Sequence, residues 1–380
     1  MSTAANFKPE RKNIIGHNGW GPLLLALAIG TVGGFAFDRL HMPLAWMLGA
    51  CVFSTIAAFA GLRIGMRVKL RQGMIIVMGV LLGSGFTPDL AQRLGQWSIS
   101  LGILTAMTFT GAALCYLWLR KVTDWNKPTC YFAAMPGGLN DMTIMGAAMG
   151  GEERAIALAH ALRILTVVLT IPLWYRLVNG AQTSVLTMVH GPTGNDWKDY
   201  AILIVCGIAG AIVGRLARLP ASFMMGPMIL SALAHLSGIT DSKPPGELVA
   251  AAQVVVGTGI GCRFVGARLD QLHKEMAASV GAALILIGCA VAFAKVTVYF
   301  TGLNLDATVL SYAPGGFAEM SLIGLALGIE TAMVATHHLF RLFVIIFSSP
   351  VAFRLWISRK PTEPVARRQV EDRRCFHCGP

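Results

Sequence analysis

The chain has 380 residues, of which 55% are hydrophobic and only 13% are charged, whereas soluble proteins carry about 25% charged residues. A soluble fold is excluded, because at least six apolar runs are long enough to cross a hydrocarbon core of about 30 Å. These runs are 20–37, 43–62, 99–119, 155–173, 277–294 and 332–353. The net charge of +12 collects in loops and tails rather than on one surface. We therefore expect no nucleic-acid partner.

The first apolar run follows a short segment that contains Lys8, Arg11 and Lys12. This charged start resembles a signal peptide, but the run leads into a second one with no clear small-residue cleavage site. We therefore predict an uncleaved first spanning helix. In the first half, crossings are expected near 20–38, 43–62, 73–90 and 97–119.

The chain contains an internal repeat. The segment around Pro136 reads AMPGGLNDMTIMG, and the segment around Pro314 reads YAPGGFAEMSLIG, 178 residues later. The same offset pairs Gly79 with Gly257, Glu152 with Glu330, His160 with His338, Arg163 with Arg341 and Pro172 with Pro350. We predict an N-terminal tail (1–17), a first membrane repeat (18–179), a linker (180–198), a second membrane repeat (199–358) and a basic tail (359–380).

The positions of Lys and Arg predict how the two repeats are oriented. In the first half they cluster at the N-terminus, over 63–71 and over 120–127, and in the second half over 215–218, 263–274 and 359–374. Because these loops are not equivalent, the positive-inside rule places all of them in the cytoplasm only if the halves are inverted. Each half then needs an odd number of crossings.

Five crossings and one re-entrant segment per half satisfy this requirement. The fold class is therefore all-α integral membrane, with about ten transmembrane helices plus two re-entrant PGG segments in two inverted repeats. The re-entrant segments are expected over 128–151 and 306–329. The alternative is that the PGG segments span, which gives six crossings per half and parallel repeats. We expect a multi-pass protein of a bacterial inner membrane with both termini cytoplasmic.

The two PGG segments are the first candidate site. Pro136, Gly137 and Gly138 precede Asp141 in the first repeat, and Pro314, Gly315 and Gly316 precede Glu319 in the second. Glycines let a backbone approach a ligand, and a helix that begins after them directs its positive end into the membrane. A carboxylate there can exchange a proton or hold a cation. The alternative is a tight turn whose carboxylate reaches water in a loop.

Two intramembrane arginines form the second candidate site. Arg163 and Arg341 each follow a histidine, His160 or His338, by three residues, which places each pair on one helix face. Arginine can hold an anionic substrate through two parallel hydrogen bonds. The alternative is an internal ion pair, with Asp141 or Glu152 in one repeat and with Glu319 or Glu330 in the other.

Other motifs favour structural roles. The runs Gly79-x-x-x-Gly83 and Gly257-x-Gly259-x-Gly261 are typical of close helix packing rather than of a nucleotide site. Cys375 and Cys378 with one His between them cannot complete a four-ligand zinc site. We expect no cofactor, no metal and no enzymatic activity, because the sequence has no nucleotide-binding or metal-ligand motif.

The chain resembles the bacterial AbrB membrane family over nearly all of residues 20–357. The resemblance is carried by MPGGLNDM and APGGFAEM, by QVVVGTGIG from Gln253 to Gly261, and by PASFMMG from Pro220 to Gly226. Family members carry provisional labels: regulator of gene expression, ammonia monooxygenase and AbrB-family transporter. The resemblance does not extend to the small soluble DNA-binding regulator of the same name.

Three functions follow from these observations. The favoured hypothesis is a secondary transporter of a small solute, an organic anion being one candidate, which works by alternating access with proton or cation coupling. The second is a membrane regulator or sensor that influences gene expression through a partner protein. A distant third is a membrane monooxygenase. The expected partners are the lipid bilayer and a small-molecule or ion substrate, with a homo-oligomer as a further option.

Overall fold

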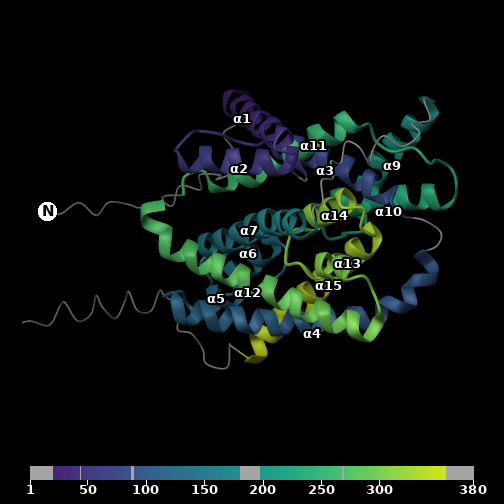
Figure 1. Ribbon diagram of the computed structural model, residues 1–380. Helices are drawn as coiled ribbons and strands as arrows, with labels where there is room; N and C mark the ends of the chain where they lie inside the picture. Colours follow the sequence, from purple (N-terminus) through teal and green to yellow (C-terminus); the bar gives the residue numbers. More distant parts are fainter. Residues whose placement is uncertain (1–19, 43, 87–89, 180–196, 268, 357–380) are drawn as a thin grey trace, which may run out of the picture.

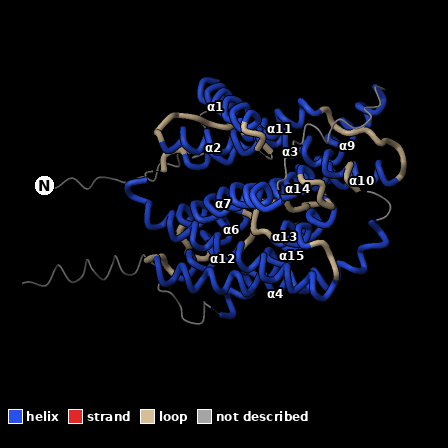
Figure 2. Tube along the Cα trace, viewed as in Figure 1, coloured by secondary structure: helices blue, strands red, loops and turns tan. Residues whose placement is uncertain are grey.

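The computed structural model describes residues 20–42, 44–86, 90–179, 197–267 and 269–356 (Figure 1). The predicted tails, 1–17 and 359–380, and most of the predicted linker lie outside these residues. The described chain is helical and contains no strand, so the all-α prediction is confirmed for it (Figure 2). Seven of its helices are long and apolar enough to cross a membrane.

The order of helices in the first half recurs in the second. The first half contains α1 (Trp20–Arg39), α2 (Ala45–Phe59), α3 (Val68–Gly83), α4 (Leu90–Val122), α5 (Lys127–Ala134), α6 (Leu139–Ala148) and α7 (Glu153–Asn179). The second contains α9 (Trp197–Leu216), α10 (Ser222–Leu236), α11 (Gly246–Gly261), the 3-10 helix η1 (Cys262–Phe264), α12 (Leu269–Thr301), α13 (Leu305–Tyr312), α14 (Phe317–Ala326) and α15 (Thr331–Trp356). Helix α3 begins at Val68, five residues before the expected crossing at 73–90. Its first turn contains the charged residues Lys69 and Arg71, which the apolar run did not include.

The helices form two groups, which lie one above the other in Figure 1. The upper group contains α1, α2 and α3 with α9, α10, α11 and η1, and the lower group contains the remaining helices of both halves. Within the upper group the halves exchange partners, since α2 packs on α11 and α3 packs on α10. A large core cluster joins the two groups, and it includes Met320 of α14, Cys51 of α2 and Met78 of α3.

Helices α4 and α12, which occupy equivalent positions in the two halves, run in opposite directions. The longest pair, α4 and α12, packs side by side: Trp118 Nε1 donates to the Ala278 carbonyl at 2.9 Å, and Cys115 Sγ donates to the Ala282 carbonyl at 3.2 Å. From Cys115 to Trp118 the residue numbers rise along α4, whereas those of their partners fall from Ala282 to Ala278 along α12, so these two helices are antiparallel.

Backbone contacts between helices at glycine explain the close packing of the upper group. A Cβ on Gly79 or Gly83 would overlap the carbonyl oxygen of Met224 or Met228, and one on Gly257 would overlap that of Met47. The packing interpretation of these glycine runs therefore agrees with the structure. Because residue numbers rise together across these contacts, α3 runs parallel to α10. The same relation holds for α11 and α2, in which Gly261 faces Ser54.

Each PGG segment lies at the turn of a helical hairpin. The Asn126 side chain before α5 donates to the Gly150 carbonyl after α6 at 2.9 Å. The Glu152 N–H donates to Thr129 Oγ1 of α5 at 2.8 Å. The first residues of α5 therefore lie beside the last residues of α6, and the two helices are antiparallel. In the second repeat, Gly324 of α14 faces Leu310 of α13, which gives the same hairpin.

Asparagine caps begin both hairpins and give a first testable prediction. Asn126 Oδ1 accepts from the Thr129 N–H at 2.8 Å, and Asn304 Oδ1 accepts from the Ala307 N–H at 3.1 Å. Loss of an N-cap costs about 1 kcal/mol. We expect Asn126→Ala to lower the free energy of unfolding in detergent more than Asn304→Ala, because Asn126 also closes its hairpin through Gly150. Equal losses would contradict this second role.

Candidate functional site

The two helix breaks leave backbone carbonyls without helical partners. Helix α5 ends at Ala134 and α6 begins at Leu139, with extended backbone at Met135 (ψ 126°) and Gly138 (ψ 136°). The last carbonyls of a helix have no intrahelical donor, and Pro136 supplies no N–H. These carbonyls are buried, so another donor must satisfy them.

Arg163 of α7 supplies that donor in the first repeat. Its Nη1 donates to the Met135 carbonyl and its Nη2 to the Gly137 carbonyl, both at 2.8 Å. The side chain is 4% exposed. A planar guanidinium suits this task because its two terminal nitrogens reach both sides of the break at once.

Arg341 of α15 makes the equivalent contacts in the second repeat. Its Nη1 donates to the Ala313 carbonyl at 2.7 Å and its Nη2 to the Gly315 carbonyl at 3.3 Å. The sequence predicted ion pairing or substrate binding for these arginines. It did not predict that they would donate hydrogen bonds to the backbone carbonyls of the helix breaks. Each arginine fixes the broken backbone of its own repeat, and the i, i+3 spacing with histidine gave no sign of these carbonyl partners.

Both arginines keep a free nitrogen. Nε of Arg163 and Nε of Arg341 are buried and have no hydrogen-bond partner. The two guanidinium groups also lie within electrostatic range of each other. Two buried cations that interact in this way repel each other, and an anion near both would relieve the repulsion. The arrangement can therefore bind an anion chemically, in addition to holding the two breaks.

The breaks themselves lie between the two repeats. A Cβ on Gly137 would approach Ile345 of α15 to 3.0 Å, and one on Gly138 would approach Leu342 to 3.9 Å. On the other side, α14, which begins directly after the second break, contacts α7 of the first repeat. Each broken hairpin therefore contacts the last helix of the other repeat, so a movement between repeats changes the surroundings of both.

The second glycine of each motif makes room for the following carboxylate. Asp141 lies in the first turn of α6, and its Oδ2 is 2.6 Å from the position that a Cβ on Gly138 would take. Glu319 lies in the first turn of α14, and its carboxylate would collide with a Cβ on Gly316. Both carboxylates lie at a helix N-terminus, where the helix dipole stabilises negative charge.

The two acids differ in exposure. Asp141 is exposed, whereas Glu319 is only 6% exposed. Glu319 lies within electrostatic range of Arg263 of η1 and of Cys51 of α2, at the boundary between the two helix groups. Pro136 and Pro314 are buried at the two breaks. The structure thus brings the predicted motif residues together within each repeat, with unequal surroundings for the acids.

The paired histidines also differ between repeats. His160 donates from Nε2 to the Phe132 carbonyl of α5 at 2.9 Å, because a carbonyl can only accept. His338 instead donates from Nδ1 to the Val334 carbonyl of its own helix at 3.0 Å. Each ring keeps one buried nitrogen without a partner, Nδ1 of His160 and Nε2 of His338. His160 is therefore a second contact between α7 and the first hairpin.

A polar network joins Tyr312 and His337 of the second repeat to Ser100 of the first, and none of the three was among the predicted site residues. His337 Nε2 bonds Ser100 Oγ at 2.8 Å, and Tyr312 donates its hydroxyl to the Ser100 carbonyl at 2.6 Å. The Tyr312 hydroxyl also bonds Thr297 Oγ1 at 2.7 Å. One signal was present in the sequence: His337 has Ala159 as its counterpart. Among the described residues, no group of three or more His, Cys, Asp or Glu side chains is placed to hold a metal ion.

Fold and site together define a class of polytopic helical membrane protein, built from two equivalent halves that each carry a broken helical hairpin. The chain belongs to the AbrB family: the family model described as "Transition state regulatory protein AbrB" matches residues 46–357. The family resemblance found in the sequence is therefore confirmed.

Two relatives match most of the chain. "Uncharacterized protein YhjN" of Bacillus subtilis (strain 168) is 23% identical over 354 residues, which cover 87% of this chain and 91% of the relative. "Putative regulator AbrB" of Escherichia coli (strain K12) is 22% identical over 347 residues, which cover 88% of this chain and 95% of the relative. The similarity thus extends across both halves.

Proposed function

We propose that this protein is a secondary transporter of a small solute, an organic anion being the favoured class. The observation that carries the proposal is the pair of buried arginines, each bound to the broken hairpin of its own repeat and within electrostatic range of the other. Broken helices paired between inverted repeats are typical of secondary transporters, whose binding sites lie where the repeats meet.

The proposed membrane topology has ten spans, five in each repeat. Helices α1, α2, α3, α4 and α7 span in the first half, and their equivalents α9, α10, α11, α12 and α15 span in the second. The hairpins α5–α6 and α13–α14 are re-entrant, since each begins and ends at one level of the structure. Antiparallel packing of α4 against α12 supports inverted repeats.

Charge supports an orientation with both termini in the cytoplasm of a bacterial inner membrane. Arg71 at the start of α3 packs beside Gly259 near the end of α11, so the cluster at 63–71 and the one at Arg263 lie at the same end of the upper group. The loop that carries Arg215 and Arg218 lies at this end too, because α10 runs parallel to α3. Three positive clusters at one end fit the positive-inside rule.

Alternating access would follow from movement of the lower group of helices against the upper group. Glu319 lies at their boundary, so a proton or cation exchanged there could bias that movement. Asp141 is exposed and lies at the equivalent turn of the first repeat. In this proposal Glu319 is the principal coupling residue, with Asp141 in a lesser role.

Uptake into liposomes tests the transport proposal and the unequal roles of the acids. With a pH gradient and a panel of small organic acids, we expect concentrative uptake by the wild type. Glu319→Gln should lower coupled uptake by about tenfold or more, in line with coupling free energies of about 1–3 kcal/mol. Asp141→Asn should have the smaller effect. Uptake that persists without any dependence on the gradient or on Glu319 would contradict the coupling mechanism.

A membrane regulator that acts through a partner protein is the second candidate. It is supported by the name of the Escherichia coli relative, "Putative regulator AbrB". The two candidates differ in one measurement, because a sensor binds its ligand without moving it across the membrane. Ligand binding without flux in sealed liposomes would favour the regulator.

A further inference from the structure

Two arginines lie close together at the boundary between the two helix groups. The Arg71 side chain of α3 covers Gly259 of α11, since its Nε lies 3.3 Å from the position that a Cβ on Gly259 would take. Arg263 of η1 follows Gly259 about one helical turn further along the chain. The two guanidinium groups are within electrostatic range of each other, and Arg263 is also within range of Glu319 of α14. Three elements therefore bring two cations and one carboxylate together.

Among the described residues, the positive charge at this place exceeds the negative charge. Ionised Glu319 balances only one of the two guanidinium groups. Cys51 and His160 also lie in electrostatic range of Arg263, but a thiol and an imidazole carry no negative charge at neutral pH. Nε of Arg71 and Nη1 of Arg263 are buried and have no hydrogen-bond partner. An anion beside both guanidinium groups would supply the missing negative charge.

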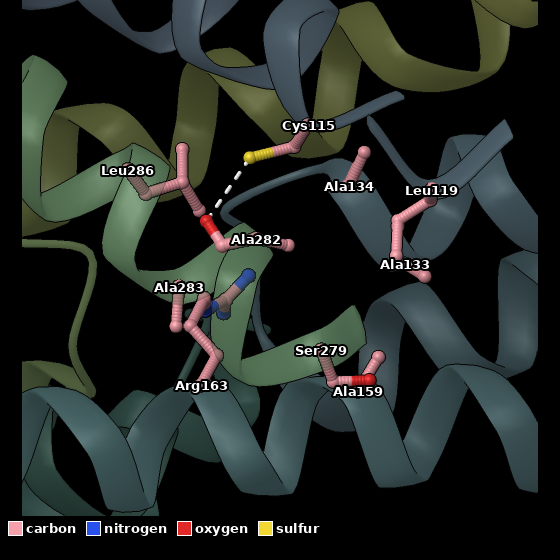
Figure 3. A pocket seen from close by; sticks show the side chains of 10 residues that line it. All are labelled: Cys115, Leu119, Ala133, Ala134, Ala159, Arg163, Ser279, Ala282, Ala283 and Leu286. Atoms are coloured by element: carbon pink, nitrogen blue, oxygen red, sulfur yellow. Dashed lines mark hydrogen bonds between the residues drawn. The ribbon is translucent and has the colours of Figure 1, made fainter. Parts of the chain in front are cut away.

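Arg71 and Arg263 are accessible, unlike the arginines of the helix breaks. Both side chains are partly exposed, whereas Arg163 is 4% exposed and its two Nη atoms already donate to carbonyls. The cavity beside Arg163 is formed by α4, α5, α7 and α12, and small residues such as Ala134 line it (Figure 3). It has space for about one water molecule, which is too little for an organic anion. A solute can therefore reach Arg71 and Arg263 more readily than Arg163.

The pair of cations occurs at one end of the protein only. At the 178-residue offset, the counterpart of Arg263 is Gly85 and that of Arg71 is Val249. Because the repeats are inverted in the proposed topology, this uncharged counterpart faces the opposite side of the membrane. Arg71 and Arg263 lie at the end of the upper group that carries the positive clusters, which is the proposed cytoplasmic end. An anion that binds them therefore comes from the cytoplasm.

We propose that Arg71 and Arg263 form a binding site for the carboxylate of a small organic anion from the cytoplasm, and that ionised Glu319 competes with this anion for Arg263. Planar guanidinium groups suit a carboxylate, which can accept from both of them. A monoanion balances the site while Glu319 is ionised, and a dianion balances it when Glu319 is neutral. The class of ligand rests on the proposed function, whereas the position of the site rests on the two arginines.

Binding of succinate and propionate tests the site. Equilibrium dialysis of each labelled acid against the purified protein in a nonionic detergent measures affinity, with sodium chloride at matched ionic strength as the reference. We expect Arg263→Gln and Arg71→Gln to weaken binding of both acids by at least about tenfold, equivalent to about 1.4 kcal/mol. Arg263→Lys, which keeps the charge, should weaken it less. Arg63→Gln, an exposed arginine at the same end, should leave binding unchanged.

A neutral residue at position 319 gives the opposite sign. Glu319→Gln removes the competing carboxylate, so it should tighten succinate binding by about fivefold or more, and propionate binding by less. A variant that merely disturbs the fold would weaken binding instead, and gel filtration with the melting temperature checks the fold of every variant. Weaker succinate binding in well-folded Glu319→Gln would overturn the competition.

Three further outcomes would overturn the site itself. The first is that neither acid binds the wild type, and the second is that both acids bind Arg71→Gln and Arg263→Gln as tightly as the wild type. The third concerns lipid, because a phosphate headgroup offers the same oxyanion chemistry. Binding of phosphatidylglycerol that depends on Arg263 and that succinate does not displace would assign the two arginines to the membrane surface.

Uptake into liposomes separates this inference from the transport proposal. Succinate binding that Arg263→Gln abolishes, without uptake by the wild type, supports the site and contradicts transport of this ligand. Uptake of an organic acid that Arg71→Gln and Arg263→Gln leave intact supports transport and overturns the site.

Discussion

Replacing Arg163 by methionine should lower the free energy of unfolding by about 2–5 kcal/mol, because the Met135 and Gly137 carbonyls both lose a hydrogen bond from a charged donor, worth about 1.5–3 kcal/mol each. The Met135 carbonyl keeps the Gly137 N–H as a donor at 2.8 Å, so the Gly137 carbonyl carries the larger share of the loss. Arg341→Met should act similarly through the Ala313 and Gly315 carbonyls. The measurement is denaturant unfolding of the purified protein in detergent, followed by tryptophan fluorescence.

Two further variants make this expectation specific to the guanidinium. Arg163→Lys keeps the charge, but a single ammonium group cannot reproduce the planar fork that reaches both carbonyls, so we expect an intermediate loss. Arg154→Met, on the exposed first turn of the same helix, should change stability by less than about 0.5 kcal/mol. If Arg163→Met and Arg154→Met unfold alike, Arg163 does not hold the break.

Two glycine-to-alanine substitutions should have the next largest effect. A Cβ on Gly49 of α2 would overlap the carbonyl oxygen of Gly33 of α1, and a Cβ on Gly226 of α10 would overlap that of Gly210 of α9. Both clashes are with backbone, so no rotamer change relieves them and the helices must separate. Overpacking of this kind costs about 1–3 kcal/mol, and we expect Gly49→Ala and Gly226→Ala to lie at the upper end.

Gly102 of α4 and Gly288 of α12 are the matched controls. Each is a helical glycine, and a Cβ on either would meet nothing within 4 Å. Alanine favours the helix over glycine by about 0.5–1 kcal/mol, so Gly102→Ala and Gly288→Ala should stabilise the protein slightly. The expected change in thermal midpoint therefore has opposite signs for the two sets. A loss of similar size in all four variants would contradict the close-packing account.

Much of the architecture could be predicted because it rests on local chemistry. The PGG motifs end α5 and α13 where expected, since proline supplies no N–H and glycine disfavours a helix. The 178-residue offset recurs in the bounds of α5 and α13 and of α6 and α14. The start of α3 was predicted less accurately. Its first turn is charged, and an apolar run indicates where a helix enters the membrane rather than where the helix begins.

The partners of the site residues could not be predicted, because they come from distant parts of the chain. Arg163 was expected to bind an acid or a substrate, yet its partners are the carbonyls of Met135 and Gly137, which carry no side-chain signature. Ser100 drew no attention as one of many serines, and only the packing of α4 against α13 and α15 brings it to Tyr312 and His337.

Hydropathy, repeat spacing and the PGG motifs are properties of the chain alone, and they were enough to predict a helical membrane protein with duplicated halves that belongs to the AbrB family. The difference between the two copies depends instead on how the helices pack. Ala134 and Tyr312 occupy equivalent positions, but a cavity remains beside one and a hydrogen-bonded network surrounds the other. The physical reason is that burial and unpaired donors depend on which helices meet, and four helices from both halves meet at Arg163.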